Sequence, residues 1–317
     1  KKDTLITGYV TDVITDLTLD WFKNKRDKNK PFMMMYLHKA PHRAWWPSPE
    51  KFAEFYEKEF PEPETLFDDY SNRGTAAKSA EMNLLTHMQY MHDSKVRPST
   101  FEEMGKVEPE IVYVRGDGTL MRPNAGGFNR PFGRANEEQK KKYDVTLDKI
   151  NADFKENWPK MNDKEKMKWK FQRYMQDYLA TISSVDDNVG RVLDYLDETG
   201  LDDNTIVIYT SDQGFYLGEH GWFDKRFIYD ESFKTPLMIK WPNKIKPGIT
   251  NDEMVQNLDF AQTFLEAAMI DVPDDMQGES LMPLLMGEND KWTREEVYYH
   301  YYDCLLYTSP SPRDGFT

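Results

Sequence analysis

The spacing of apolar and polar positions along the chain predicts alternating helices and strands. Apolar residues recur three or four positions apart over 163–199, and Gly200 follows as a helix stop signal. Ser48 is placed to cap a helix that starts at Pro49. The other helical patterns cover 12–22, 49–60 and 259–270. Short continuous apolar runs, typical of strands covered on both faces, occupy 31–37, 205–209 and 236–241, and a last strand begins at 296–301.

This order of elements is typical of an α/β fold with a central, mostly parallel sheet flanked by helices. Ligands of such open sheets bind beyond the carboxyl ends of the strands, where loops converge. Two predicted strand ends are rich in polar side chains, at residues 38–42 and 211–226. Residues 75–160 give the weakest pattern, and we interpret them as a long excursion from the scaffold, of the kind that shapes substrate pockets.

Composition narrows the class of protein. The chain of 317 residues has a formal net charge of −14, which argues against a surface that tracks nucleic-acid phosphates. Its apolar stretches are all shorter than the roughly 20 residues that span a bilayer. The single cysteine, Cys304, excludes an intrachain disulfide framework and a thiolate metal site. We therefore expect a folded domain with no nucleic-acid partner and no membrane span.

The two ends of the sequence are unusual. The first twenty residues already resemble the interior of a domain, so we expect the native N-terminus to lie upstream of Lys1. The stretch "CLLYTSPSPRD", from Cys304 to Asp314, matches the translation of a sequencing-library adapter residue for residue. Our hypothesis is that 304–317 is adapter read-through. A longer genomic sequence that encodes these residues in place would contradict it.

Asp212 and Gln213 are candidate metal ligands. Each offers a hard oxygen, the ligand type that Ca²⁺ and Mg²⁺ prefer, and both follow a predicted strand directly. Gly214 would let the backbone leave the strand sharply. Taken alone, the sequence Ser-Asp-Gln-Gly is more often an ordinary turn at a strand end.

Lys225 and His42 are candidate anion-binding residues. Lys225 is a compact cation suited to an anionic oxygen, and His42 can donate a hydrogen bond to the same group or protonate a leaving oxygen. The competing interpretations are a solvated surface lysine and a histidine satisfied by a backbone carbonyl. His220 is a candidate substrate-binding residue for which a structural role fits equally well.

Three ordered blocks of sequence resemble a known family. They are "PFMMMYLHKAPHRAWWP", "YLATISSVDDNVGRVLDYLDETGL" and "IVIYTSDQGFYLGEHGWFDKRFIYDESFKTPLMIKWP". Together they are similar to the formylglycine-dependent sulfatases of the alkaline phosphatase superfamily, and in particular to the branch that acts on sulfated glycans, with its N-acetylglucosamine-6-sulfatase-like and iduronate-sulfatase-like enzymes. The resemblance covers most of residues 1–303 and is weakest between about 75 and 160.

The resemblance implies a role for each candidate residue. Asp212 matches a metal-ligand aspartate and Gln213 the adjacent ligand position, and the ion in the family is usually Ca²⁺, with Mg²⁺ as the alternative. Lys225 matches a lysine that contacts the substrate sulfate, and His42 a histidine that binds the sulfate near the leaving oxygen. Both are expected to be catalytic and, with His220, to bind substrate.

The resemblance also implies a domain plan. Residues 1–285 would form the catalytic domain without its N-terminal part, and 286–303 would begin a small C-terminal subdomain. The expected substrate is a sulfated oligosaccharide or a glycosaminoglycan-like chain, and the expected location is the periplasm or the cell exterior.

The family's nucleophile is a hydrated formylglycine made in a Cys/Ser-x-Pro-x-Arg motif, which the resemblance implies would lie upstream of Lys1. Ser309 to Arg313 imitates that motif, but its prolines are misplaced and it lies at the wrong end of the fold. We therefore expect the 317-residue chain to be inactive by itself. The alternatives are a phosphonate or phosphate ester hydrolase of the same superfamily and a degenerate protein that only binds sulfated glycans.

Overall fold

The computed structural model describes residues 5–105, 113–114, 120–121 and 125–299. The proposed adapter segment 304–317 lies outside these ranges. The chain divides into two compact units. Among the described residues, the first unit comprises those within 5–195 and 215–232, and the second comprises those within 196–214 and 233–299.

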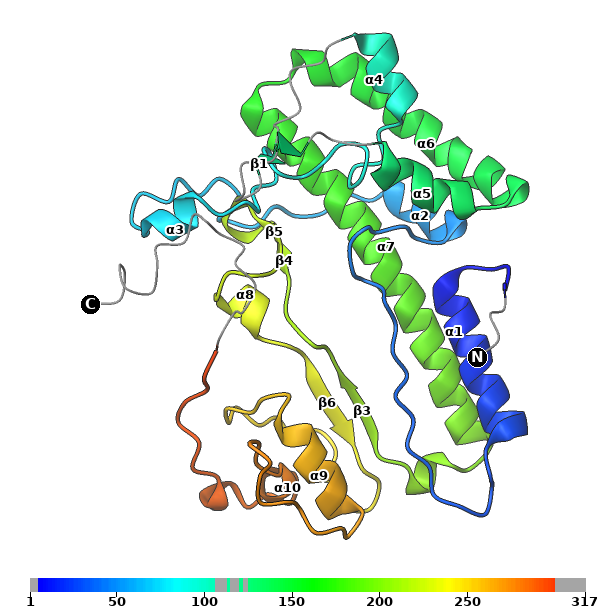
Figure 1. The fold of residues 1–317 in the computed structure, drawn as a ribbon, viewed down its shortest axis with the longest axis vertical. Coiled ribbons are helices and arrows are strands. Elements are labelled where there is room, and N and C mark those ends of the chain that lie inside the picture. The colour runs from blue at the N-terminus through cyan, green and yellow to red at the C-terminus, as the bar shows by residue number, and fades with distance from the viewer. Residues whose placement is uncertain (1–4, 106–112, 115–119, 122–124, 300–317) are drawn as a thin grey trace. The chain divides into compact units, whose positions relative to one another are not determined.

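A long helix, α7 (Asp163–Glu198), is the main element of the first unit and confirms the helix predicted over 163–199. α1 (Val10–Asp20) runs beside it and continues as a short π-helical turn, Trp21–Lys25 (Figure 1). The amide of Asn188 on α7 donates to Asp12 of α1 at 2.7 Å, which ties the two helices together. The helix predicted over 12–22 is therefore confirmed.

The predicted cap at Ser48 is also confirmed. α2 spans Pro49–Tyr56 and is shorter than the predicted 49–60. The Ser48 hydroxyl accepts the backbone N–H of Lys51 at 3.3 Å, which satisfies one of the free donors of the first helical turn.

Residues 75–160 contain several elements within the first unit. These are α3 (Thr75–Lys78), α4 (Pro98–Met104), the antiparallel strands β1 (Tyr113–Val114) and β2 (Leu120–Met121), α5 (Gly126–Arg134), α6 (Glu137–Asn157) and a 3₁₀ turn (Trp158–Lys160). α6 opens with a capping box between Asn136 and Gln139 and packs on α2 through Tyr143 and Leu147, which contact Phe52. Helix α6, within residues 75–160, therefore shares a hydrophobic core with α2, which lies outside that segment.

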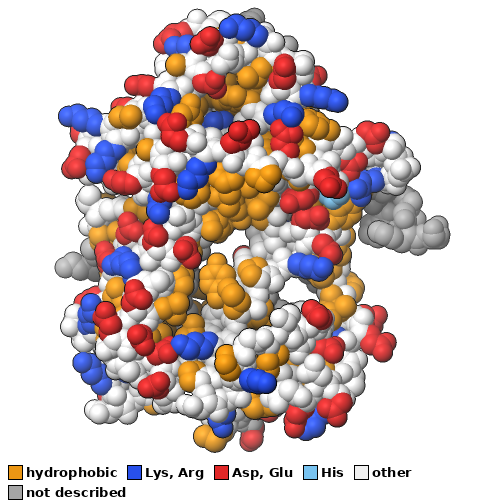
Figure 2. Space-filling model, turned by 180° about the vertical axis from the view of Figure 1, so that it is seen from behind, with side chains coloured by type: hydrophobic (Ala, Val, Ile, Leu, Met, Phe, Trp, Pro, Cys, Tyr) orange, Lys and Arg blue, Asp and Glu red, His pale blue; other side chains and the backbone are white. Residues whose placement is uncertain are grey.

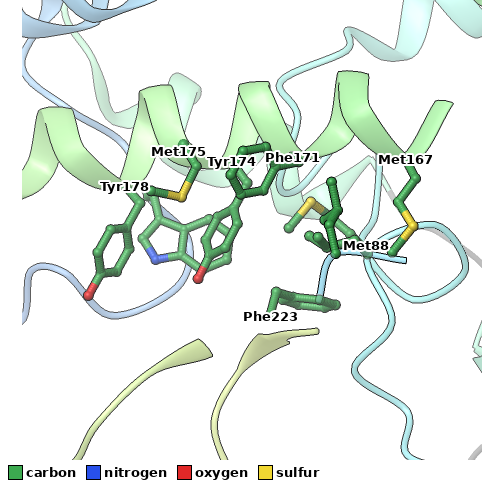
Figure 3. Packing of buried hydrophobic residues seen from close by; sticks show 10 residues of the cluster. Met88, Met167, Phe171, Tyr174, Met175, Tyr178 and Phe223 are labelled. Atoms are coloured by element: carbon green, nitrogen blue, oxygen red, sulfur yellow. The ribbon is translucent and has the colours of Figure 1, made fainter. Parts of the chain in front are cut away.

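The largest core of the first unit lies along one face of α7. Met167, Phe171, Tyr174, Met175 and Tyr178 project from successive turns of the helix in one direction (Figure 3). The remaining buried members of this core come from other segments of the same unit and are Trp45, Leu66, Leu84, Met88 and Phe223. Phe223 lies opposite the helix in Figure 3. Aromatic side chains bury large areas, so this face supports the segments that lie on it.

The paired strands are short. In the first unit, β4 (Tyr216–Leu217) pairs antiparallel with β5 (Phe223–Asp224). In the second unit, β3 (Val207–Thr210) pairs antiparallel with β6 (Leu237–Lys240), with Val207 opposite Lys240. The strands predicted over 205–209 and 236–241 therefore exist, and the mixture of helices and strands confirms the predicted α/β class. The strand pairs within the described residues are all antiparallel, which differs from the mostly parallel arrangement expected for the central sheet.

The strand predicted over 31–37 is wrong as secondary structure. Its backbone is extended and its side chains alternate, with Met33, Met35 and Leu37 each 67% exposed. The other face packs inward, where the Phe32 ring meets the Phe22 ring edge-on at a centroid distance of 5.2 Å. A continuous apolar run predicts burial on both faces only when a second layer covers it, and here one face alone is covered.

The second unit holds the remaining helices. They are α9 (Asp259–Ala267), which confirms the helix predicted over 259–270, α10 (Met282–Leu285) and the 3₁₀ turns Asp202–Asn204 and Asn289–Lys291. The first unit also contains the 3₁₀ turn Glu219–Gly221, and α8 (Asp230–Phe233) ends at the boundary between the units. The strand predicted over 296–301 does not form in its described part, 296–299.

Candidate functional site

The segments that carry His42 and Lys225 both pack on the aromatic face of α7. Trp45, three residues after His42, is fully buried, and its ring lies 4.7 Å from that of Tyr174. Phe215 stacks on Tyr178 at 5.3 Å, and the Lys225 ammonium lies 5.5 Å from the Phe215 ring centroid. The long helix therefore supports both candidate residues within one unit.

Hydrogen bonds fix the loop around His42. Its backbone N–H donates to the carbonyl of Lys39 at 2.8 Å, and the Trp45 indole donates to the carbonyl of Pro41 at 2.8 Å. The exposed ring of His42 places Nδ1 2.5 Å from the carbonyl oxygen of Arg43. A carbonyl can only accept, so Nδ1 carries the proton of this bond and Nε2 remains for a ligand. The carbonyl of Arg43 thus engages Nδ1 of His42 and leaves Nε2 available to a ligand.

Lys225 is held more firmly than a solvated surface lysine, since its side chain is only 17% exposed. Its backbone N–H donates to the Asp224 carboxylate at 3.0 Å, and its ammonium lies 3.7 Å from the same oxygen. The other oxygen of Asp224 accepts from Arg226. Because Arg226 shares the charge of Asp224, the ammonium of Lys225 is only loosely neutralised and can attract an anion.

His220 lies in a buried polar cluster. It is 9% exposed, and its Nδ1 lies 3.0 Å from the Asp68 carboxylate and 3.1 Å from the Arg73 guanidinium. Its Nε2 lies 3.8 Å from the Glu231 carboxylate. Burial raises the pKa of Asp68, but the Tyr70 backbone N–H, His220 and Arg73 outweigh burial and lower it. Both ring nitrogens of His220 therefore have charged neighbours, which fits a structural role. A role of His220 in substrate binding stays a prediction.

Glycine brings the His220 turn close to α7. Gly218 and Gly221 have φ angles of 105° and 68°, which favour glycine. A Cβ at Gly218 would lie 2.6 Å from the Phe171 ring, and one at Gly221 would lie 2.5 Å from Met167. The turn can approach the helix this closely only because both positions lack a side chain.

A neighbouring loop supports the turn from another direction. The backbone of Leu84 donates to the carbonyl of Gly221 at 2.8 Å, and Phe223 donates to Met82 at 2.9 Å. His87 stabilises this loop, because its Nδ1 accepts the backbone N–H of Asn83 at 3.2 Å. Burial, together with the charge of Lys170, lowers the pKa of His87 to about 4, so this ring is neutral at pH 7.

Asp212 and Gln213 lie in the second unit, directly after β3. The Asp212 side chain is exposed, and its nearest hydrogen-bond partner is the Ser211 hydroxyl at 3.4 Å. The same hydroxyl donates to the Gln213 carbonyl at 2.9 Å. The Asn257 amide donates to the carbonyls of Ser211 and Asp212 at 3.4 and 3.3 Å, which fixes the backbone of the turn.

The chemistry of this turn fits part of a site for a hard cation. Ca²⁺ takes six to eight oxygen ligands and Mg²⁺ six, so the side chains of Asp212 and Gln213 would supply two of them. Within the ranges that the structure covers, no group of three or more His, Cys, Asp or Glu side chains is arranged to hold a metal ion.

Sequence reasoning missed the residues that fix the candidates in place. Arg43 directly follows His42, but its partner Asp93 is 50 residues away, and nothing in the spacing pairs them. Asn257 likewise contacts the Asp212 turn across 45 residues. The only available signal was the charged side chain of Arg43 directly before the apolar and aromatic residues 44–47.

Two surface properties bear on possible partners. On the face shown in Figure 2, acidic and basic side chains are interspersed and form no continuous basic patch. In the described part of the chain, no helix combines the length and the apolar character needed to cross a bilayer.

Comparison with known proteins gives consistent similarities. Residues 218–310 match the family model described as N-sulphoglucosamine sulphohydrolase, C-terminal, a range that ends inside the segment 304–317. An N-acetylglucosamine-6-O-sulfatase of Bacteroides thetaiotaomicron is 44% identical over 299 residues, which are 93% of this chain and 50% of that protein. The human N-acetylglucosamine-6-sulfatase is 37% identical over 123 residues, 38% of this chain and 22% of that protein.

Among solved structures, one similar protein was determined in complex with its substrate D-glucosamine-2-N,6-O-disulfate. It is 41% identical and superimposes with a TM-score of 0.82, covering 95% of this chain and 57% of that chain. The present chain thus spans about half the length of the bacterial relative and of this solved protein.

Proposed function

Because this chain belongs to the sulfatases of the alkaline phosphatase superfamily, we propose that it is part of an enzyme that hydrolyses the sulfate ester of a carbohydrate. Sulfatases generally use a metal ion and a formylglycine. The finer proposal is that the ion is Ca²⁺, with Mg²⁺ as the alternative, and that the formylglycine belongs to a part of the protein outside this chain.

Lys225 and His42 would bind the sulfate group. The partly neutralised ammonium of Lys225 would hold one anionic oxygen of the sulfate. His42 would use Nε2, because Nδ1 is engaged by the Arg43 carbonyl. An alcohol is a poor leaving group as an alkoxide, so the imidazolium form of His42, protonated on both ring nitrogens, would assist departure by donating its Nε2 proton to the ester oxygen. The engaged Nδ1 of His42 is the observation that supports this assignment most.

Asp212 and Gln213 would hold the metal ion, which when bound would supply the positive charge that sulfate ester hydrolysis requires. Their side-chain oxygens suit such an ion, and the bonds from Asn257 fix the backbone that presents them. His220 would contribute to substrate binding mainly by fixing the turn that precedes Lys225.

We propose a sulfated amino sugar within an oligosaccharide or glycosaminoglycan-like chain as the substrate. The support is the activity named for the bacterial relative and the disulfated glucosamine bound to the similar solved protein. The same similarities disfavour a phosphonate or phosphate ester hydrolase. Such polymers lie outside the cytoplasm, so we also propose a periplasmic or secreted location.

Binding of a sulfated sugar to the 317-residue chain tests this proposal. In calorimetric titrations we expect D-glucosamine 6-sulfate to bind and D-glucosamine not to bind. Lys225→Ala should weaken binding by at least about tenfold, since it removes a charge-assisted contact. The matched control is Lys141→Ala, which removes the same charge from an exposed position on α6. Equal binding of the sulfated and unsulfated sugars would contradict the proposal.

A further inference from the structure

The Arg43 side chain reaches into the core of the first unit, where it pairs with the buried Asp93. Its Nε donates to one oxygen of Asp93 at 2.7 Å and its Nη2 to the other at 2.5 Å. The Asp93 side chain is fully buried and also accepts the backbone N–H of Gln89 at 2.8 Å. Two parallel bonds to an immobile carboxylate fix both the position and the plane of the guanidinium. The backbone of Arg43, whose carbonyl receives the Nδ1 proton of His42, is fixed with it.

The same guanidinium reaches the segment that carries Lys225. Its central carbon lies 5.1 Å from the centroid of the Phe223 ring, which is 2% exposed and only two residues before Lys225. Asp224, which lies between Phe223 and Lys225 in the sequence, is 3% exposed, and its carboxylate accepts a hydrogen bond from the backbone N–H of Lys225. Burial opposes the charge of Arg43, but the carboxylates of Asp93 and then of Asp224 outweigh it and raise its pKa. Arg43 is therefore a permanent cation that lies between the two segments.

We propose that Arg43 is a positioning residue that sets the His42 loop and the Lys225 segment relative to each other, so that one sulfate group can contact both. The inference rests on the proposed function of His42 and Lys225. The distances between the oxygens of a sulfate are fixed. Two groups that bind the same sulfate must therefore be positioned relative to each other to within a fraction of an ångström. One planar guanidinium, bound at its edge by Asp93 and lying over the Phe223 ring, couples the two segments directly.

The positioning role of Arg43 depends on the planar, two-pronged shape of its side chain as well as on its charge. A lysine at position 43 would keep the positive charge beside Asp93 but lose the two-pronged bond and the contact of the planar guanidinium with the Phe223 ring. Arg43→Lys therefore separates positioning from simple charge balance. Phe223→Leu tests the same role from the Lys225 segment, because it leaves the bond to Asp93, keeps an apolar side chain in the core and removes the ring that faces the guanidinium.

The test uses the 317-residue chain and inorganic sulfate as the probe. We would follow the ring signals of His42 by NMR while sulfate is added at constant pH. In the wild type, sulfate should shift these ring signals, because the bound anion contacts the imidazole. In Arg43→Lys, with circular dichroism unchanged, this shift should disappear and sulfate should bind at least about tenfold more weakly.

The control is Arg97→Lys, because Arg97 also pairs with two carboxylate oxygens, from Asp144 and Asp148, and contacts neither candidate segment. It should respond to sulfate like the wild type. If Arg43→Lys does not fold, Phe223→Leu gives the deciding result, with the sulfate-induced shift of the His42 ring signals reduced. A response equal to that of the wild type in the folded variant would overturn the positioning role and leave the proposed function standing. No response in the wild type would overturn both.

Discussion

The segment that carries Lys225 and the turn that carries Asp212 follow one another in the sequence, yet they are held in opposite ways. Lys225 lies beside the buried Phe223 and Asp224, on a face of aromatic side chains. Asp212 is exposed, and its turn is held by two long hydrogen bonds from Asn257 and one hydroxyl. We infer that substitutions around Lys225 alter both stability and ligand binding, whereas substitutions around Asp212 alter binding with little effect on folding.

The largest expected effect is the loss of the ion pair beneath the His42 loop. Asp93→Ala removes both bonds to Arg43 and leaves its guanidinium poorly compensated, which should lower the free energy of unfolding by about 3–5 kcal/mol. Urea denaturation monitored by circular dichroism measures this change. The control, Asp148→Ala, breaks an exposed pair with Arg97 and should cost less than about 1 kcal/mol. Equal costs for the two variants would contradict the structural importance of the buried pair.

The next effect is a loss of stability in mild acid. The pKa of His87 is about 4 in the folded protein and near 6.5 when unfolded, so between these values the unfolded chain binds the extra proton. Stability should therefore fall as the pH falls from about 6.5 to about 4, by up to about 3 kcal/mol from this residue. In His87→Asn, which keeps an acceptor for the Asn83 N–H, that part of the decrease should vanish. The measurement is the urea midpoint as a function of pH, and an unchanged profile in the variant would refute the assignment.

The smallest expected effect on stability is at the Asp212 turn. Asn257→Ala removes two bonds of 3.3–3.4 Å from an exposed site and should cost less than about 1 kcal/mol. If the turn presents metal ligands, the same variant should weaken binding of Ca²⁺ by a few-fold in a calorimetric titration. Asp212→Asn should weaken it more, because it removes the carboxylate charge. Unchanged Ca²⁺ binding in both variants would contradict the proposal that Asp212 and Gln213 are metal ligands.

Periodicity predicted the helices well and the sheet poorly, for physical reasons. The helix α7 buries one stripe of side chains along most of its length, so a period of three to four residues is sufficient to identify it. The apolar run 31–37 also predicts burial, but the sequence does not contain the information on which layer covers each face. Met33 and Met35 are exposed here for that reason.

The candidate residues were visible in the sequence, but their supports were not. His42 and Lys225 stand out because a histidine or lysine in a loop after a predicted strand is chemically conspicuous. The contacts that fix them join positions far apart, such as Arg43 with Asp93 and Tyr174 with the carbonyl of Tyr216. Such pairings depend on how the segments pack on α7, and local patterns do not encode them.

The most direct test of the account is a crystal structure of the chain with D-glucosamine 6-sulfate bound. We predict that the sulfate lies within hydrogen-bonding distance of both Nε2 of His42 and Nζ of Lys225, with Arg43 still paired to Asp93. A sulfate group bound elsewhere, or in contact with only one of the two side chains, would contradict the central claim that they form one sulfate-binding site.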